Sequence, residues 1–243
     1  MKLALTGLLT TVGLGGAIAV LQTPGETDLG AYSTTLKGRN SNQRQNAIRA
    51  LEELNGKVIA PGAEFSFNQT VKGWTRDVGY KLAPVSYNGQ LVDSWGGGVC
   101  QTSTTLYNAA LLAGLEVTER NRHRFMPSYV PPGRDAAVAF ENIDLRFRNT
   151  YPFPIRILGS VQGERLIIKL SGSGKAVTPL SVSNEVRDIR EKSTHVYRGT
   201  KDRIRNSGKT GFEVWVYRNW ADRRELISTD DYPAMDAVIE KSR

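Results

Sequence analysis

The stretch from Trp95 to Leu115, WGGGVCQTSTTLYNAALLAGL, most constrains the fold, because it holds no charged residue although Asp93 and Glu116 flank it. Such a segment is expected at the buried centre of a domain, and it is too polar to span a membrane. Small and apolar residues recur within it at helical spacing, and Gly114 stands where a glycine commonly ends a helix. The stretch therefore predicts a central buried helix.

Cys100, the only cysteine of the chain, lies at or just before the predicted start of this helix, with Thr102 or Ser103 as the expected cap. Unpaired backbone N–H groups and the positive end of the helix dipole stabilise a thiolate there, and the thiolate is the reactive form of cysteine. A small buried side chain without chemistry is the other interpretation. The sequence leaves both open.

The composition is that of a folded protein with basic character. A chain of 243 residues, 40% of them hydrophobic, is long enough for one domain and a smaller module. The net charge of +8 favours polyanionic partners, which outside a cell means wall polymers or membrane headgroups rather than nucleic acid. The basic residues are scattered, however, and the densest runs are also typical of solvated loops.

The N-terminus has the pattern of a targeting segment. It carries one early lysine, an apolar run from Leu3, and small residues at Ala17 and Ala19 in an A-x-A arrangement. This predicts an export signal over residues 1–19, or an uncleaved membrane anchor as the alternative. An exported protein with one thiol cannot form an internal disulfide, so that thiol is either shielded or used.

Hydrophobic spacing predicts the remaining elements. Residues 20–40 are predicted to be a linker, and residues 41–55 an amphipathic helix capped by Ser41 or Asn42. Short strands and hairpins are predicted within residues 58–67, 83–94, 115–118, 137–148 and 154–170. The predicted fold is α+β, with the central helix and one amphipathic helix packed on mostly antiparallel strands, followed by a small all-β module over residues 174–243. Parallel pairing is not expected, because few strands are separated by a helix.

Four blocks of sequence carry a resemblance to a known family. PGAEFSFNQTV, GYKLAPVSYNGQLV, GGGVCQTSTTLYNAALLAGLEVTERNRH and SYVPPGRDAAV follow one another in the order typical of the VanW family. The resemblance predicts a VanW-like domain over residues 41–173. It implies a role in the bacterial cell envelope, since members are usually exported, but no particular reaction. The segment from Gly208 onward is similar to the small β modules that often follow such domains.

The surroundings of Cys100 are also similar to those of transglutaminase-like and papain-like cysteine enzymes. In those enzymes the nucleophile begins a helix, a histidine from a neighbouring strand takes its proton, and a carboxylate or amide orients the imidazole. This resemblance makes Cys100 the nucleophile, His123 the base and Asp135 the third member, with Asp144 as the alternative. Two arginines flank His123 and are expected to disfavour its imidazolium, and a plain surface histidine is an equally open interpretation.

Further residues are candidates for substrate contact. The glycines at 96–98 permit close backbone approach, and the N–H groups of Cys100 and Gln101 are placed to donate to an oxyanion. Gln101, Trp95 and Asn68 are the predicted substrate-binding residues. No cofactor and no metal site are predicted, because one cysteine and two histidines would leave most of a zinc shell to carboxylates.

Two functions fit these features. The first is a cysteine-dependent hydrolase or transpeptidase acting on peptide or amide bonds of the cell wall. The second is a non-catalytic envelope module that binds wall polymer or scaffolds other proteins, with Cys100 filling the core. In either case the expected partner is wall polymer or wall peptide, the expected location is outside the cytoplasm, and contact with the membrane is expected only through the N-terminal segment.

Overall fold

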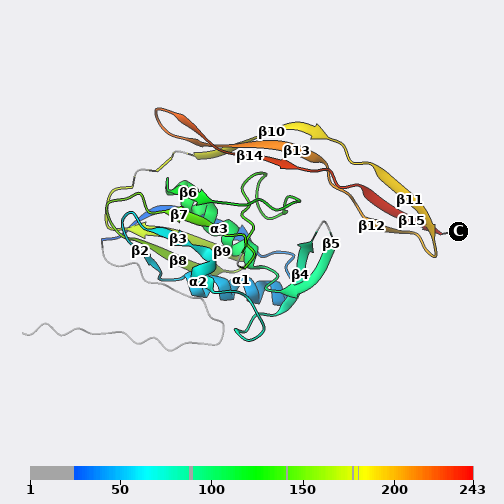
Figure 1. Cartoon of the computed structure of the whole chain (residues 1–243), viewed down its shortest axis with the longest axis horizontal. Helices are drawn as coiled ribbons and strands as arrows, with labels where there is room; N and C mark the ends of the chain where they lie inside the picture. The colour runs from blue at the N-terminus through cyan, green and yellow to red at the C-terminus, as the bar shows by residue number, and fades with distance from the viewer. Residues whose placement is uncertain (1–24, 88–89, 141, 177, 180, 243) are drawn as a thin grey trace, which may run out of the picture.

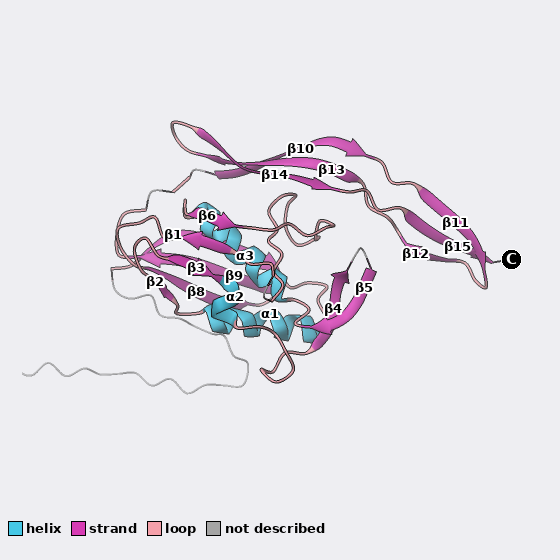
Figure 2. Ribbon diagram, in the orientation of Figure 1, coloured by secondary structure: helices cyan, strands magenta, loops and turns pink. Residues whose placement is uncertain are grey.

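The computed structural model describes residues 25–242 except 88–89, 141, 177 and 180 (Figure 1). The export signal or anchor predicted for residues 1–19 lies outside the described residues. In the part of the chain that the structure describes, no helix is both long and apolar enough to cross a membrane. Helices and antiparallel sheets combine in the part up to residue 172, which is called the body below, and only strands follow in the C-terminal module (Figure 2). This arrangement confirms the predicted α+β class.

The two main helices lie close to their predicted positions. Helix α1, Ser41–Leu54, is amphipathic and buries Ala47, Ala50 and Leu51 along one face. Its cap is Asn40 rather than the predicted Ser41 or Asn42, because the Asn40 side chain and the Gln43 side chain satisfy each other's backbone N–H groups in a capping box.

Helix α3, Val99–Leu112, is the predicted central helix, and its residues from 101 to 111 are all buried. Its buried hydroxyls and amides find partners inside the domain: the hydroxyl groups of Thr105 and Thr34 lie 2.8 Å apart, and the Asn108 amide donates to the carbonyl of Arg134 at 2.7 Å. A polar helix can occupy the centre of the core because these groups are hydrogen-bonded.

A four-stranded antiparallel sheet supports both helices. Its order is β1, Thr27–Thr35, then β9, Arg165–Gly172, then β8, Ile155–Gln162, then β2, Val58–Ile59. Helix α3 packs against β1 and β9, and α1 packs against β8 and α3. Residues 27–35 therefore belong to the folded domain, and the prediction of a linker over residues 20–40 is wrong there.

The reason for that error lies in the packing of β1. Gly30 sits where β1 crosses α3, and a Cβ atom at this position would lie 2.4 Å from the backbone nitrogen of Ala113. The strand thus approaches the helix through small and polar residues instead of a clear apolar alternation, which is the signal that identifies strands in a sequence.

Two smaller sheets complete the body. One is three-stranded, in the order β3 (Glu64–Ser66), β7 (Arg146–Arg148) and β6 (Glu116–Glu119). The other is the predicted hairpin of β4 (Leu82–Tyr87) and β5 (Gln90–Trp95). The short helix α2, Phe67–Val71, follows β3 directly. The turn predicted for this hairpin falls on residues 88–89, outside the described residues.

The strand predicted over residues 137–148 is present only as β7. Before it, the chain makes isolated bridges from Ala137 to Asn121 and from Ala139 to Ile143, so it turns back on itself instead of running along a neighbour. The alternation of apolar residues here reflects packing of a loop against the core, to which Val138 and Leu145 belong. Phe140, which belongs to the same apolar set, is 45% exposed, so an alternation of period two neither requires a ladder partner nor identifies every buried side chain.

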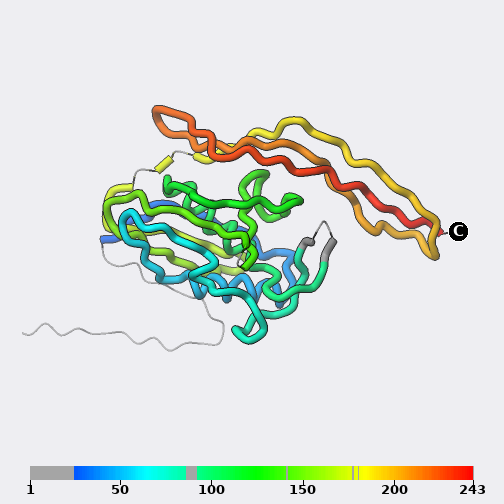
Figure 3. Tube along the Cα trace, viewed as in Figure 1, coloured from blue at the N-terminus to red at the C-terminus, as the bar shows by residue number. Residues whose placement is uncertain are grey.

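The C-terminal module consists of two three-stranded sheets. The first has the order β10 (Ser181–Arg190), β13 (Gly211–Asn219) and β14 (Arg224–Tyr232). The second has the order β11 (Thr194–Gly199), β15 (Ala237–Ser242) and β12 (Arg203–Asn206). The first sheet lies along the body beside β6 and α3, and the second extends beyond it toward the C-terminus (Figures 1 and 3). The pair β11 and β15 is parallel, contrary to expectation, because the strands of the first sheet, rather than a helix, make the crossover between them.

Candidate active site

Cys100 lies in the first turn of α3. The helix begins at Val99, and its N-cap is Gly98, which has a left-handed φ of 114° and no side chain to form a cap. The predicted caps are therefore wrong: Thr102 and Ser103 lie inside the helix and donate instead to the carbonyls of Ala47 and Ala136. The backbone N–H groups of Val99 and Gln101 donate to the carbonyls of Gly96 and Gly98, both at 3.0 Å, so the positive end of the helix dipole is what favours a thiolate here.

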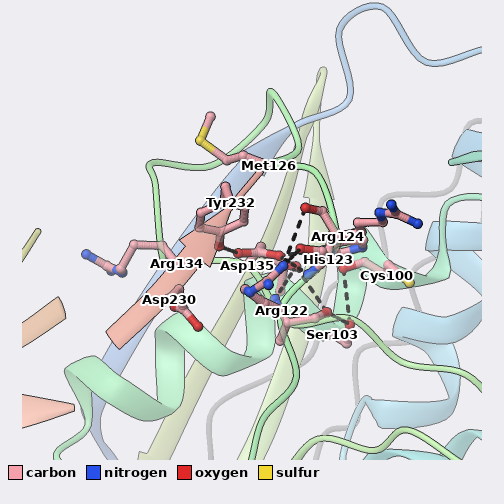
Figure 4. A network of polar contacts seen from close by, with 12 residues as sticks. Cys100, Ser103, Arg122, His123, Arg124, Met126, Arg134, Asp135, Asp230 and Tyr232 are labelled. Carbon is pink, nitrogen blue, oxygen red and sulfur yellow. Dashed lines mark hydrogen bonds and ion pairs between the residues drawn. The ribbon is translucent and has the colours of Figure 1, made fainter. Parts of the chain in front are cut away.

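His123 and Asp135 come together beside this helix end. His123 follows β6, and Asp135 follows the turn that Pro131 and Pro132 begin. The imidazole Nδ1 lies 2.6 Å from Asp135 Oδ2, and the backbone N–H of His123 donates to the same oxygen at 2.7 Å (Figure 4). The Cys100 thiol donates to the Val138 carbonyl at 3.4 Å, and it lies close enough to the imidazole for the charge of each group to shift the pKa of the other. The structure thus groups the three residues predicted to be catalytic, with a direct hydrogen bond between His123 and Asp135.

The pKa values of these groups favour a thiolate and an imidazolium. Burial by itself raises the pKa of the Cys100 thiol, but the nearby imidazolium of His123 outweighs burial and leaves that pKa below its ordinary value. Burial likewise lowers the pKa of His123, and the hydrogen bond with Asp135 together with the negative charges of Asp135 and Cys100 raises it to about 10. The two arginines that flank His123 in sequence were expected to disfavour the imidazolium, and that expectation is wrong because Asp135 dominates.

Asp135 is held as a carboxylate in a buried position. Burial raises the pKa of its carboxyl group, whereas the hydrogen bond from His123 and the positive charge of Arg120 lower it to about 2. Its side chain is inaccessible to solvent, and Arg120 Nη2 donates to its Oδ1 at 3.0 Å. A permanently ionised carboxylate is the group that orients an imidazole and stabilises its protonated form.

Asp144, the alternative third member, serves another purpose. Its carboxylate accepts hydrogen bonds from the Ser66 hydroxyl at 2.5 Å, from the Asn68 backbone N–H at 2.9 Å and from Arg146 Nε at 3.0 Å. These contacts join β3, α2 and β7. Asp135 is therefore the carboxylate that meets His123.

Gln101 is not available to a substrate. Its side-chain amide is buried and donates to the Thr34 hydroxyl at 3.0 Å and to the Thr35 carbonyl at 2.8 Å, while its Oε1 accepts from Arg39 Nε at 3.0 Å. Its backbone N–H donates to the Gly98 carbonyl at 3.0 Å. Gln101 thus ties β1 to α3, and the oxyanion role predicted for its N–H is not supported.

The other two predicted substrate contacts, Trp95 and Asn68, are both half-buried. Trp95 is half-buried at the end of β5, directly before the glycine turn that leads into α3. Asn68 is half-buried; its amide donates to the carbonyls of Ala139 and Ile143, and it lines a cavity of about 440 Å³ together with Phe140. Their contact with a substrate stays a prediction.

Sequence reasoning did not find several residues that contact the site. Tyr129 lies near it: its ring packs under the guanidinium of Arg39 at 4.8 Å, and burial and the charge of Cys100 raise its pKa. From the C-terminal module, the Tyr232 hydroxyl donates to Asp135 Oδ1. No local pattern marks these residues, because loops and distant strands bring them to the site.

Comparison with known proteins identifies the family. A family model described as VanW like protein matches residues 42–171, which is more than half of the chain. The chain belongs to the VanW family. The family match covers Cys100, His123 and Asp135, and it ends at the close of β9. The C-terminal module lies outside it.

Two curated proteins are similar to the VanW-like part. The chain is 41% identical over 145 residues to the uncharacterized protein YoaR of Bacillus subtilis (strain 168), which covers 60% of this chain and 48% of YoaR. It is 32% identical over 124 residues to the vancomycin B-type resistance protein VanW of Enterococcus faecalis (strain ATCC 700802 / V583), covering 49% of this chain and 45% of that protein. The chain thus spans about half the length of these relatives. No solved structure matches the chain.

Proposed function

We propose that this VanW-family chain is a cysteine-dependent enzyme that transfers acyl groups at peptide or amide bonds. The observation that carries the proposal is that Cys100 at the start of α3 lies beside His123, which follows β6, while Asp135 lies 2.6 Å from the imidazole on its other side. Cys100 is the nucleophile, His123 moves the proton, and Asp135 orients the imidazole and stabilises its charged form.

The proposed reaction has two steps. In the first, the Cys100 thiolate attacks the carbonyl carbon, the C–N bond breaks, and the leaving amine takes the proton of the His123 imidazolium. In the second, water or a second amine gives a proton to His123 and attacks the thioester, which releases the acyl group and restores the thiolate. Water as acceptor makes the enzyme a hydrolase, and an amine makes it a transpeptidase.

The proposed substrate is a wall peptide outside the cytoplasm. Two facts support this class: one relative is named for vancomycin resistance, and the first residues of the chain have the pattern of an export signal or anchor. Incubation of the protein with muropeptides and mass spectrometry of the products tests this class. Cleavage or cross-linking that the Cys100→Ser variant does not perform supports it, and unchanged peptides overturn it.

Alkylation by iodoacetamide tests the nucleophile itself, because the chain has one cysteine and modification is read directly from the mass. At pH 7 a free thiol is only a few per cent ionised, so a thiolate held by His123 should react about tenfold faster than the same cysteine in the unfolded chain. His123→Gln should abolish the gain. His195→Gln, at a solvent-exposed histidine of the C-terminal module, is the matched control. Protection of Cys100 until the protein unfolds would overturn the proposal.

A binding role is the second candidate, and one observation favours it. The sheet of β11, β15 and β12 extends beyond the body, and Val196 and Ile204 on it are 61% and 69% exposed. Large exposed apolar side chains on a projecting sheet are typical of contact surfaces. Co-sedimentation of the Cys100→Ser variant with insoluble cell wall would support binding, and loss of sedimentation in a Val196→Ser/Ile204→Ser variant would locate it on this sheet.

A further inference from the structure

Asp135 receives hydrogen bonds from two separate parts of the chain. On its Oδ2 side it contacts His123, which belongs to the VanW-like domain. On its Oδ1 side the Tyr232 hydroxyl donates to it from the end of β14 in the C-terminal module (Figure 4). Tyr232 is 1% exposed and Asp135 is fully buried, so water does not compete for this bond.

Arg120 makes a second link between the module and Asp135. Its Nη2 donates to Asp135 Oδ1 at 3.0 Å, its Nε donates to the Asp135 carbonyl at 2.6 Å, and its Nη1 pairs with Asp230 of β14 at 2.6 Å. All three side chains are less than one tenth exposed. A buried arginine between two carboxylates has a fixed orientation, since each N–H of its planar fork has a set direction.

Further contacts join the C-terminal module to the segments around His123 and Asp135. The guanidinium of Arg122 lies 5.3 Å from the centre of the Tyr232 ring, and Lys209 Nζ donates to the Met126 carbonyl at 2.9 Å. A Cβ atom on Gly133 would lie 2.4 Å from Cγ2 of Val216 in β13. The module therefore packs directly on the segment that carries His123 and on the turn that leads to Asp135.

We propose that the C-terminal module completes the cysteine site, with Tyr232 and Asp230 as positioning residues that fix the Asp135 carboxylate toward His123. This inference rests on the proposed function and adds to it that the region matched by the family model holds only part of the site. With Oδ1 held by Tyr232 and Arg120, the carboxylate cannot rotate, and Oδ2 stays directed at the imidazole. Tyr232 acts through Asp135 rather than on the thiol or the imidazole.

The ionisable neighbours of Asp135 determine what a substitution changes. They are Cys100, Arg120, His123, Tyr129, Arg134, Tyr107 of α3, and Tyr232 and Asp230 of β14. Burial and the charge of Asp135 raise the pKa of Tyr232, so its hydroxyl remains a donor at neutral pH. Replacing Tyr232 by phenylalanine removes one neutral donor and changes no charge.

The test is the pH profile of Cys100 alkylation in the full chain with Tyr232→Phe. We expect a rate at pH 7 reduced about threefold to tenfold, an acid limb shifted toward that of an ordinary thiol, and a changed or lost low-field NMR signal from the His123 Nδ1 proton. Tyr197→Phe is the matched control, because Tyr197 lies in the same module and its hydroxyl contacts Glu240 instead. A Tyr232→Phe profile and NMR signal equal to those of the wild type would overturn the inference.

Asp230→Asn is the second variant, and it covers the case in which Tyr232→Phe lowers thermal stability. It keeps the Tyr232 hydroxyl in place and weakens only the ion pair with Arg120, so the same shift of the acid limb is expected; an unchanged acid limb in this folded variant overturns the inference.

The proposed function and the positioning role of the module fail in different ways. If wild-type Cys100 shows no acceleration and no dependence on His123, the proposed function fails; if both are present and the Tyr232 and Asp230 variants match the wild type, only the positioning role fails.

Discussion

At the scale of single residues, Asp135 decides the state of the site. Among the described residues it is the carboxylate that contacts His123, and it is fully buried with donors on both oxygens. A buried charge is stable only when it is paired and hydrogen-bonded, and here His123 and Arg120 supply both. The positive charge that Asp135 maintains on His123 in turn favours the thiolate of Cys100.

The pH dependence of stability tests this description of Asp135. Its pKa falls from an ordinary 3.8 to about 2 on folding, so the ionised carboxylate favours the folded state above pH 3.8, and this contribution is lost as the pH falls through about 2. The difference corresponds to about 2 kcal/mol. Asp135→Asn should lower the free energy of unfolding by about 3–5 kcal/mol at pH 7, and the gap to wild type should narrow near pH 2.

Urea unfolding followed by tryptophan fluorescence at pH 7, 4 and 2.5 measures this gap. Asp222→Asn, at an aspartate whose side chain is 76% exposed, should change the free energy of unfolding by less than about 0.5 kcal/mol at each pH. An Asp135→Asn deficit of the same size at pH 7 and pH 2.5 would contradict the assignment.

At the scale of elements, the start of α3 is where the fold produces the candidate site. The three glycines before the helix let the chain turn sharply against α1 and place Cys100 in the first turn. Gly98 has both a left-handed φ and a close neighbour: a Cβ atom there would lie 2.3 Å from the Gln43 carbonyl oxygen of α1. At Gly96 a Cβ atom would lie 2.2 Å from the Trp74 side chain, and at Gly97 it would lie 2.6 Å from the Ala83 carbonyl oxygen of β4. The glycines therefore serve close packing, which is sufficient reason for them without a bound ligand.

Gly98→Ala should destabilise the protein by about 2–4 kcal/mol, because the new Cβ adds a collision with backbone to the cost of a left-handed alanine. Gly62→Ala provides the comparison, since Gly62 has a φ of 72° and a Cβ atom there would meet no other described residue within 4 Å. That variant should lose only about 1 kcal/mol. Equal losses in chemical denaturation would show that α1 and α3 do not meet closely at Gly98.

At the scale of the whole molecule, the C-terminal module is bound to the body through buried polar contacts. Arg218 of β13 is 6% exposed; its Nη1 donates to the Leu115 carbonyl at 2.5 Å, and its Nη2 pairs with Glu225 at 2.9 Å. Leu115 directly follows the turn that ends α3. This contact links the module to the end of the same helix whose beginning carries Cys100.

Arg218→Met should lower the free energy of unfolding by about 2–3 kcal/mol, because it leaves the buried Leu115 carbonyl without its charged donor. Hydrogen exchange should also become faster in β13 and in the last turn of α3. Lys241→Met removes an exposed salt bridge of the same module, and a loss below about 1 kcal/mol is expected. If the two variants are equally stable, the module is not anchored through Arg218.

The sequence by itself determined the elements with strong local signals and the family. Helices α1 and α3, the hairpin of β8 and β9, and the place of Cys100 near a helix start all follow from spacing, glycines and charge within a few residues of each position. The choice between Asp135 and Asp144, the internal role of Gln101 and the strand β1 were decided only by the tertiary structure. So were the contacts of Tyr232 and Asp230 with the site. These features depend on which distant segments pack together. The residues next to a buried polar group in the chain do not indicate which distant group is its hydrogen-bond partner.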